Sequence, residues 1–303
     1  MEKTMTIEEF RKRFKTEEDC LNYLIELKWS LGYKCPKCEH NKYSKGRNWF
    51  YRRCKQCNYD ESVTANTMFH KCKLGLLKAF EIGYRISVKR KGMSTNELSK
   101  EFGCQQRSAW LLKAKYQNAM QSSDKYPLEN LVEVDEFLVG GFDENERGRS
   151  LESKQLVILG VEKVIDKKGK VTIGRAYAKL IENGSAEELK PFFEQKIEKH
   201  AKITTDGWRG YWPLHKDWTI EKKLSDKGKG FPELHIHIMN IKGWLRGIHH
   251  KCKGNRLQNY LDEFHFRFNR RCFLNSILDK LILRAMDLQP VPYMKIKVCE
   301  LNT

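Results

Sequence analysis

The spacing of apolar residues changes near residue 127, and this change divides the chain into two parts. Before it, apolar residues recur every three or four positions, which predicts helices. The predicted helical segments are 7–30, 74–90, 95–102 and 105–120. The polar stretch 121–127 ends in a proline, which is typical of a domain boundary.

After this boundary, short apolar runs predict β-strands. The predicted strands are 131–139, 154–164, 171–181 and, after an amphipathic helix at 185–200, the first part of 201–211. From His235 to about residue 288 the pattern is again mainly helical. Three strands, a helix and a further strand form the order of a ribonuclease-H-like α/β core.

Two of the predicted helices are separated by a single glycine. Ser94 or Thr95 can cap the first helix, which ends at Phe102, and Gly103 makes the turn into the second. Helix, glycine turn and helix form the helix-turn-helix pattern of DNA-binding proteins, although any helical hairpin can share it.

The cysteine spacing gives the strongest local signal in the sequence. Two C-x2-C pairs are separated by fifteen residues, and their members are Cys35, Cys38, Cys54 and Cys57. Two such pairs typically supply four thiolates to one tetrahedral Zn²⁺. Redox-active pairs are the less favoured alternative. Short strand-like stretches lie between and after the pairs, so we expect a zinc ribbon with one structural Zn²⁺.

The net charge of +18 is concentrated in two regions. Residues 34–91 hold 15 Lys and Arg against 4 Asp and Glu, and residues 240–303 hold 12 against 5. This distribution favours a polyanionic partner, most simply nucleic acid. No apolar run is long enough to span a bilayer, and the N-terminal stretch lacks a signal-peptide core. We therefore expect no membrane segment and a cytoplasmic, nucleoid-associated protein.

Acidic residues interrupt the apolar strand "LVEVDEFLVGG" at residues 131–141. In a ribonuclease-H-like core this strand is central, and the strand ending at Asp206 lies beside it. Asp135 would then adjoin Asp206, and two adjacent carboxylates repel unless a cation holds them. Taken singly, Asp135 can be a strand-end partner of a Lys or Arg, and Asp206 an Asp-Gly turn residue. Together they predict a site for Mg²⁺ or Mn²⁺, with two ions per active site.

Four blocks in order, "VEVDEFLVGG", "TTDGWRGY", "IKGWLRGIHH" and "YLDEFHFRFNRR", resemble those of bacterial insertion-sequence transposases. The group concerned has an N-terminal zinc ribbon and an ISXO-like DDE domain, and the resemblance covers about residues 15 to 285. It implies metal-dependent cleavage at terminal inverted repeats and transfer of the freed 3'-hydroxyl into target DNA. The expected parts are an N-terminal helical segment (1–30), a zinc ribbon (31–70), a helix-turn-helix region (71–122), a ribonuclease-H-like catalytic domain (128–288) and a C-terminal tail (289–303).

The third catalytic position departs from the plain DDE pattern. In the family it precedes a lysine by two helical turns; here that lysine is Lys242, and seven residues upstream lies His235. The resemblance therefore implies an Asp-Asp-His site with Lys242 as a phosphate contact. A different helix register would exchange His235 for one of three neighbours, Glu233, His237 or Asn240.

The last block carries the family's Glu-Arg-Arg signature at Glu263, Arg267 and Arg270. An intrahelical ion pair and a support or DNA-backbone contact beside the site are both compatible with this spacing. The residues expected to contact DNA are Arg52, Arg53, Arg107, Lys242, Arg246, Arg267 and Arg270, with Glu263 as a supporting residue.

The partners implied are the transposon ends and target DNA, bound by a homodimer or higher oligomer. Two other functions remain open from the sequence. One is a catalytically inactive, transposase-derived DNA-binding regulator, which the missing third acid favours weakly. The other is a metal-dependent nuclease without strand transfer.

Overall fold

The computed structural model describes residues 4–140, 154–166, 168–224, 226, 229–249, 256–293 and 296. The chain divides into two compact units. The first comprises residues 1–119 and 272–301, and the second residues 120–271 and 302–303. None of the described helices is both long and apolar enough to cross a membrane.

The first unit begins with two capped helices, α1 (Ile7–Arg13) and α2 (Glu17–Lys28). The hydroxyls of Thr6 and Thr16 each accept a hydrogen bond from the backbone N–H three residues on, and the carboxylate at that position accepts one from the backbone N–H of the threonine. These capping boxes satisfy backbone N–H groups that a helix N-terminus otherwise leaves without partners. They explain why the predicted segment 7–30 forms two helices.

A three-stranded antiparallel sheet follows, with β1 (Tyr43–Lys45), β2 (Tyr51–Cys54) and β3 (Asp60–Ser62) in that order. Cys35 and Cys38 lie in a turn before β1, and Cys54 and Cys57 lie at the turn between β2 and β3. The residue after each pair, Glu39 or Asn58, has a positive φ near 60° and donates its N–H to the carbonyl of the first cysteine. The two pairs therefore form matching tight turns.

Three helices complete the N-terminal part of the first unit: α3 (Leu76–Val88), α4 (Thr95–Phe102) and α5 (Gln106–Met120). Ser94 caps α4 in a capping box with Glu97, and Gly103 ends it in the left-handed conformation at φ 54°. The elements expected for the helix-turn-helix segment are thus present with the predicted cap and turn.

The helix α9 (Ile277–Asp287) also packs in the first unit, against α2 and α3. Asp279 accepts a hydrogen bond from the Tyr23 hydroxyl at 2.6 Å and lies 2.8 Å from the Arg13 guanidinium. The catalytic domain was expected to extend to residue 288, but α9, which lies within that range, packs in the first unit instead. The apolar face of α9 is buried by N-terminal helices, so α9 belongs to the first unit. The last described helix of the second unit is therefore α8. Most of the expected tail, 289–303, lies outside the described residues.

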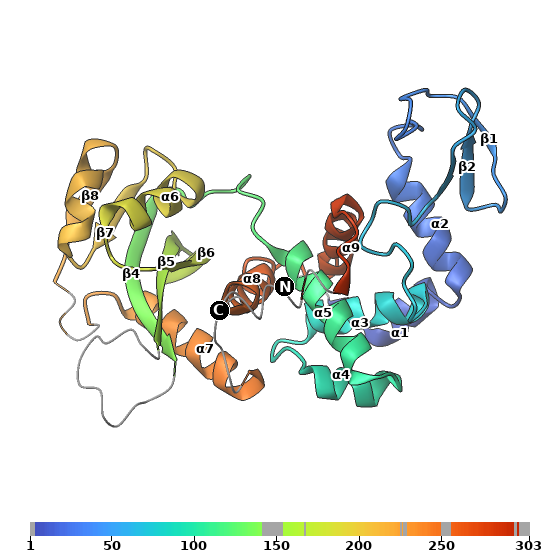
Figure 1. The fold of residues 1–303 in the computed structure, drawn as a ribbon. Coiled ribbons are helices and arrows are strands. Elements are labelled where there is room, and N and C mark those ends of the chain that lie inside the picture. The colour runs from blue at the N-terminus through green and yellow to red at the C-terminus, as the bar shows by residue number, and fades with distance from the viewer. Residues whose placement is uncertain are drawn as a thin grey trace. The chain divides into compact units, whose positions relative to one another are not determined.

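The second unit contains a five-stranded mixed sheet (Figure 1). Its strand order is β6-β5-β4-β7-β8, and β4 is central, as predicted. β5 pairs antiparallel with both β4 and β6, whereas β7 is parallel to β4 and to β8. The bounds are β4 (Leu131–Gly140), β5 (Lys154–Ile165), β6 (Val171–Ile181), β7 (Lys202–Thr205) and β8 (Thr219–Lys222).

Helices cover both faces of this sheet (Figure 1). One face packs against α7 (Pro232–Ile248) and α8 (Arg256–Phe268), and the other against α6 (Ala186–Lys196) and the 3-10 helix η1 (Arg209–Lys216). Successive residues of a strand point to opposite faces. In β4, Val132 and Val134 face α6, whereas Phe137 and Val139 face α7 and α8. Burial on both faces explains why apolar residues occupy both alternating sets of positions in β4.

Candidate active site and metal centre

The four cysteines of the N-terminal turns converge on one point. Their sulfur atoms all lie within 4.8 Å of one another. The Sγ atoms of Cys35 and Cys57 are 3.6 Å apart, and those of Cys38 and Cys54 are 3.5 Å apart. A tetrahedral Zn²⁺ with Zn–S bonds of about 2.3 Å would hold its sulfurs about 3.8 Å apart. The cluster therefore fits a structural zinc ion.

In the second unit, the register of β4 and β7 brings two aspartates together. Val134 pairs with Thr205 in the parallel ladder, so the next residues, Asp135 and Asp206, lie side by side where β7 ends. Asp135, Asp206 and Glu136 each offer a carboxylate oxygen, and these oxygens lie within 4.8 Å of one another. Opposite ligands of an octahedral Mg²⁺ are about 4.2 Å apart, so a divalent cation fits this group.

Backbone amides orient both aspartates. The N–H of Glu136 donates to Oδ1 of Asp135 at 2.8 Å, and the N–H of Trp208 donates to Oδ1 of Asp206 at 3.0 Å. Gly207 makes the turn between Asp206 and Trp208 at φ 85°, a conformation that favours glycine. One oxygen of each aspartate is thereby oriented by the backbone.

Glu136 reaches the same place from the opposite face of the sheet. The hydroxyl of Tyr211, on η1, donates a hydrogen bond to its carboxylate. Burial raises the pKa of Glu136 to about 7, and the charges of Asp135 and Asp206 act in the same direction, although the Tyr211 hydrogen bond opposes them. A bound cation would favour the ionised carboxylate.

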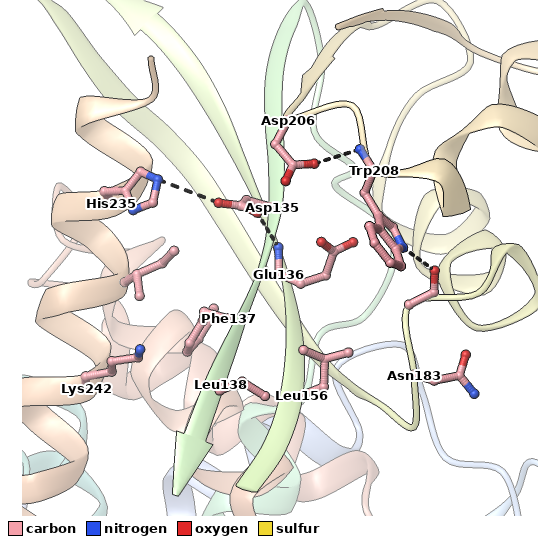
Figure 2. Close-up of a pocket in the computed structure, with 12 residues that line it drawn as sticks. Asp135, Glu136, Phe137, Leu138, Leu156, Asn183, Asp206, Trp208, His235 and Lys242 are labelled. Carbon is pink, nitrogen blue, oxygen red and sulfur yellow. Dashed lines mark hydrogen bonds and ion pairs between the residues drawn. The ribbon is translucent and has the colours of Figure 1, made fainter. Parts of the chain in front are cut away.

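The helix α7 supplies a histidine and a lysine to this site (Figure 2). Nε2 of His235 lies 3.6 Å from Oδ2 of Asp135 and has no hydrogen-bond partner among the described residues, although it is buried. Lys242 lies two turns further along the same helix face. Partial burial, together with the charge of Arg246, lowers the pKa of Lys242, and a phosphate would favour its charged form.

The three neighbours considered in place of His235 lie elsewhere. His237 is buried against α8, where its Nε2 lies 3.2 Å from Nε2 of His265. Asn240 is exposed, Glu233 is half-buried, and neither lines the cavity at the aspartates. The helix register therefore brings His235, of these four, to the site.

A cavity of about 490 Å³ joins these groups. It is lined by Asp135, Glu136, Phe137, Leu138, Leu156, Asn183, Gly184, Asp206, Trp208, His235, Ile238 and Lys242. Figure 2 shows His235 and Lys242 on one side of β4, and Trp208 and Asn183 on the other. The aspartates lie between these two sides.

The Glu-Arg-Arg signature lies in the core next to this site. Arg267 is 7% exposed and bonded to the fully buried Glu263, and its guanidinium lies 5.1 Å from the ring centroid of Trp244. The expectation that Arg267 contacts DNA therefore conflicts with its burial. Glu263 and Arg267 form the intrahelical ion pair that was the other interpretation of this spacing.

The other arginines predicted to contact DNA differ in their exposure to solvent. Arg52 is stacked between Trp29 and Tyr43, with ring centroids 4.0 and 4.1 Å away. Arg270 is half-buried and donates to the carbonyl of Phe266. The other three, Arg53, Arg107 and Arg246, are exposed.

Three residues at the site were not predicted from the sequence: Glu136, Tyr211 and Trp208. Because successive residues of a strand point to opposite faces, the sequence pattern placed Glu136 and Asp135 on different faces of the sheet and did not bring them to one site. The block "TTDGWRGY" contains the other two, but their direction depends on how η1 folds back after the Asp-Gly turn.

Comparison with known proteins agrees with these two sites. Residues 127–269 match the ISXO2-like transposase domain, and residues 15–60 match the transposase zinc-ribbon domain. A Halobacterium salinarum protein, described as an uncharacterized protein in transposable element ISH50, is 24% identical over 274 residues. The aligned part covers 84% of this chain and 92% of that relative.

These matches define the class as an insertion-sequence transposase with a zinc ribbon that contains a four-cysteine cluster. Within this class, residues 127–269 form a transposase domain of the ISXO2-like kind. The two matched domains imply DNA binding and a divalent metal in the transposase domain.

Proposed function

We propose that this protein cuts DNA at the terminal inverted repeats of its insertion sequence and transfers the freed 3'-hydroxyls into target DNA. The observation that carries the proposal is the adjacency of Asp135 and Asp206 across the β4–β7 ladder, with His235 and Lys242 facing them. The strand order, with a central β4 and an antiparallel β5, supports a ribonuclease-H-like catalytic domain.

Asp135, Asp206 and His235 would hold the catalytic metal, and Glu136 offers a further oxygen. Two Mg²⁺ or Mn²⁺ ions, when bound, activate the attacking hydroxyl and stabilise the leaving oxygen. Lys242 would bind a phosphate beside the aspartates. The apolar residues Phe137, Leu138 and Ile238 line part of the cavity and lower the local polarity, which strengthens these electrostatic interactions.

Recognition of the transposon end is proposed to reside in the first unit. The supporting features are the helix pair α4–α5, the exposed Arg53 and Arg107, and the excess of basic residues in 34–91. Cutting both ends together requires two catalytic sites, so we expect at least a dimer on DNA and a nucleoid-associated protein.

The test is cleavage and joining of a labelled duplex that carries the terminal repeat flanking the gene. Wild-type protein with Mg²⁺ should cut at the repeat and join it to a second duplex. Asp135→Asn and Asp206→Asn preserve side-chain shape and should abolish both steps while binding to the repeat persists. If the wild-type protein binds the repeat but does not cut it, the result would favour an inactive DNA-binding regulator. If it cuts the repeat but does not join it to a second duplex, the result would favour a nuclease without strand transfer.

A further inference from the structure

Trp208 is exposed at the catalytic cavity, yet its position is fixed. It lines the cavity while 42% of the residue is exposed to solvent. Its indole Nε1–H donates to the carbonyl of Gly184 at 2.8 Å. Fixing the orientation of an exposed aromatic side chain contributes little to the stability of the fold. The fixed orientation of Trp208 in the cavity therefore points to a ligand.

Two glycines make room for the indole. A Cβ atom at Gly184 would lie 2.8 Å from Nε1 of Trp208, and one at Gly210 would lie 2.9 Å from the same atom. Gly210 would also meet the carbonyl oxygen of Gly184 at 2.1 Å. Side chains at either position would displace the ring, so glycine at both positions is matched to this orientation of Trp208.

The indole is also linked to the catalytic aspartates. The backbone N–H of Trp208 donates to Asp206, two residues earlier, through the turn at Gly207. A shift of Trp208 would therefore move a hydrogen-bond donor of Asp206. The turn therefore fixes the positions of the Trp208 ring and the Asp206 carboxylate relative to each other.

The two sides of the cavity differ in chemistry, and the difference matches a nucleotide (Figure 2). On the α7 side, Lys242 offers a cation for a phosphate. On the other side, the Trp208 ring offers a flat aromatic surface, and the exposed Asn183 amide offers N–H donors for a base edge. Bases stack on such rings without regard to sequence, because every base has a π-face.

We propose that Trp208 stacks on the base of a nucleotide adjoining the scissile phosphate, after that base has left the duplex stack. The proposal rests on the proposed function, because it takes the scissile phosphate to lie at Asp135 and Asp206. Trp208 then positions the DNA strand against the aspartates, and Lys242 binds the phosphate from the opposite side.

The test compares cleavage of intact duplex with cleavage of duplexes that lack one base on either side of the cut. On intact duplex with Mg²⁺, Trp208→Ala should cut roughly 5- to 100-fold more slowly than wild type, the range expected for loss of one base–aromatic stack. On one of the two abasic duplexes, wild type and Trp208→Ala should cut at equal rates, since the base that Trp208 contacts is absent.

Matched variants separate stacking from folding. Gly184→Ala keeps the tryptophan but displaces the ring, and it should show the same deficit on intact DNA and the same equality on the abasic duplex. Trp208→Phe keeps a flat ring and should retain most of the rate. Trp212→Ala removes a tryptophan that is 60% exposed on η1, the helix that begins directly after Trp208, but does not line the cavity, and its rate should be unchanged.

Three outcomes overturn the inference: no deficit of Trp208→Ala on intact DNA, a deficit that persists undiminished on both abasic duplexes, or a Gly184→Ala variant with the wild-type rate. Failure of the proposed function would give a different result, because wild-type protein would then cut none of the duplexes.

Discussion

Nε2 of His235 lies 3.6 Å from Oδ2 of Asp135, although the two residues are one hundred positions apart in the sequence. The distance is too long for a hydrogen bond, and no other described residue bonds this nitrogen. The separation is within ion-pair distance for a protonated imidazole, and it also fits two atoms that ligate one cation.

We predict that His235→Ala lowers cleavage by more than about 100-fold, because even residues that only support a metal ligand typically cost 10- to 100-fold when removed. His235→Glu should retain part of the activity, since it restores an oxygen ligand from the same helix face. Cleavage of a labelled terminal-repeat duplex measures each rate, with Mg²⁺ and Mn²⁺ compared.

Asn240→Ala is the matched control on the same helix, and it should cut at the wild-type rate because Asn240 does not line the cavity. Full activity of His235→Ala together with an inactive Glu136→Gln would instead assign the third metal ligand to Glu136.

For the zinc ribbon, Cys54→Ser should lose the structural metal, because three thiolates no longer close the tetrahedral site. Elemental analysis of purified protein should give about one zinc per chain in the wild type and markedly less in the variant. Cys272→Ser is the control, since Cys272 is an exposed free thiol. Equal zinc content in Cys54→Ser and wild type would contradict the assignment.

The buried His265 should make the second unit sensitive to acid. Burial lowers the pKa of His265 to about 4, although its hydrogen bond to the Leu261 carbonyl opposes this shift. In the unfolded chain the pKa is about 6.5, so the unfolded state takes up the proton first as pH falls. The stability is therefore complete above pH 6.5 and is lost progressively as pH falls towards 4.

Thermal unfolding followed between pH 7.5 and 4.5 measures this dependence. His265→Leu should be less stable at neutral pH, because it leaves His237 without its hydrogen-bond partner at His265. Its stability should nevertheless fall less steeply with acid than that of the wild type. Identical slopes for the two proteins would show that His265 does not cause the acid sensitivity.

The packing of α9 predicts that the first unit is incomplete without it. Leu281 is fully buried in α9, and Leu281→Ala should destabilise this unit by about 2–5 kcal/mol, the usual range for such a truncation. A fragment of residues 1–127 should melt without a sharp transition, and a flexible linker to residues 272–303 should restore cooperative melting. A sharp transition at an unchanged temperature in 1–127 alone would contradict this prediction.

Local spacing and strand order were sufficient to predict much of both sites. The cysteine spacing predicts the cluster because each tight turn is made within a few residues. Strand order predicts the contact of Asp135 with Asp206, because the partner of a central parallel strand follows from the order of elements.

Features that depend on long-range packing could not be predicted in this way. The apolar stripe of α9 indicates which face is buried but not which helices bury it. β8 has only four residues, mostly exposed, and gives no strand signal of its own. The orientation of Trp208 depends on Gly184, twenty-four positions earlier, and no periodicity in the sequence joins them.

The chain leaves the first unit after residue 119 and returns to it at residue 272, so α9 is synthesised long after the N-terminal part of that unit. On a translating ribosome, the transposase domain is therefore made in full before the N-terminal helices can receive α9. Protein that is cut short before α9 would carry Asp135 and Asp206 but an unfinished N-terminal unit. The connectivity thus makes completion of the zinc-ribbon unit depend on prior synthesis of the transposase domain.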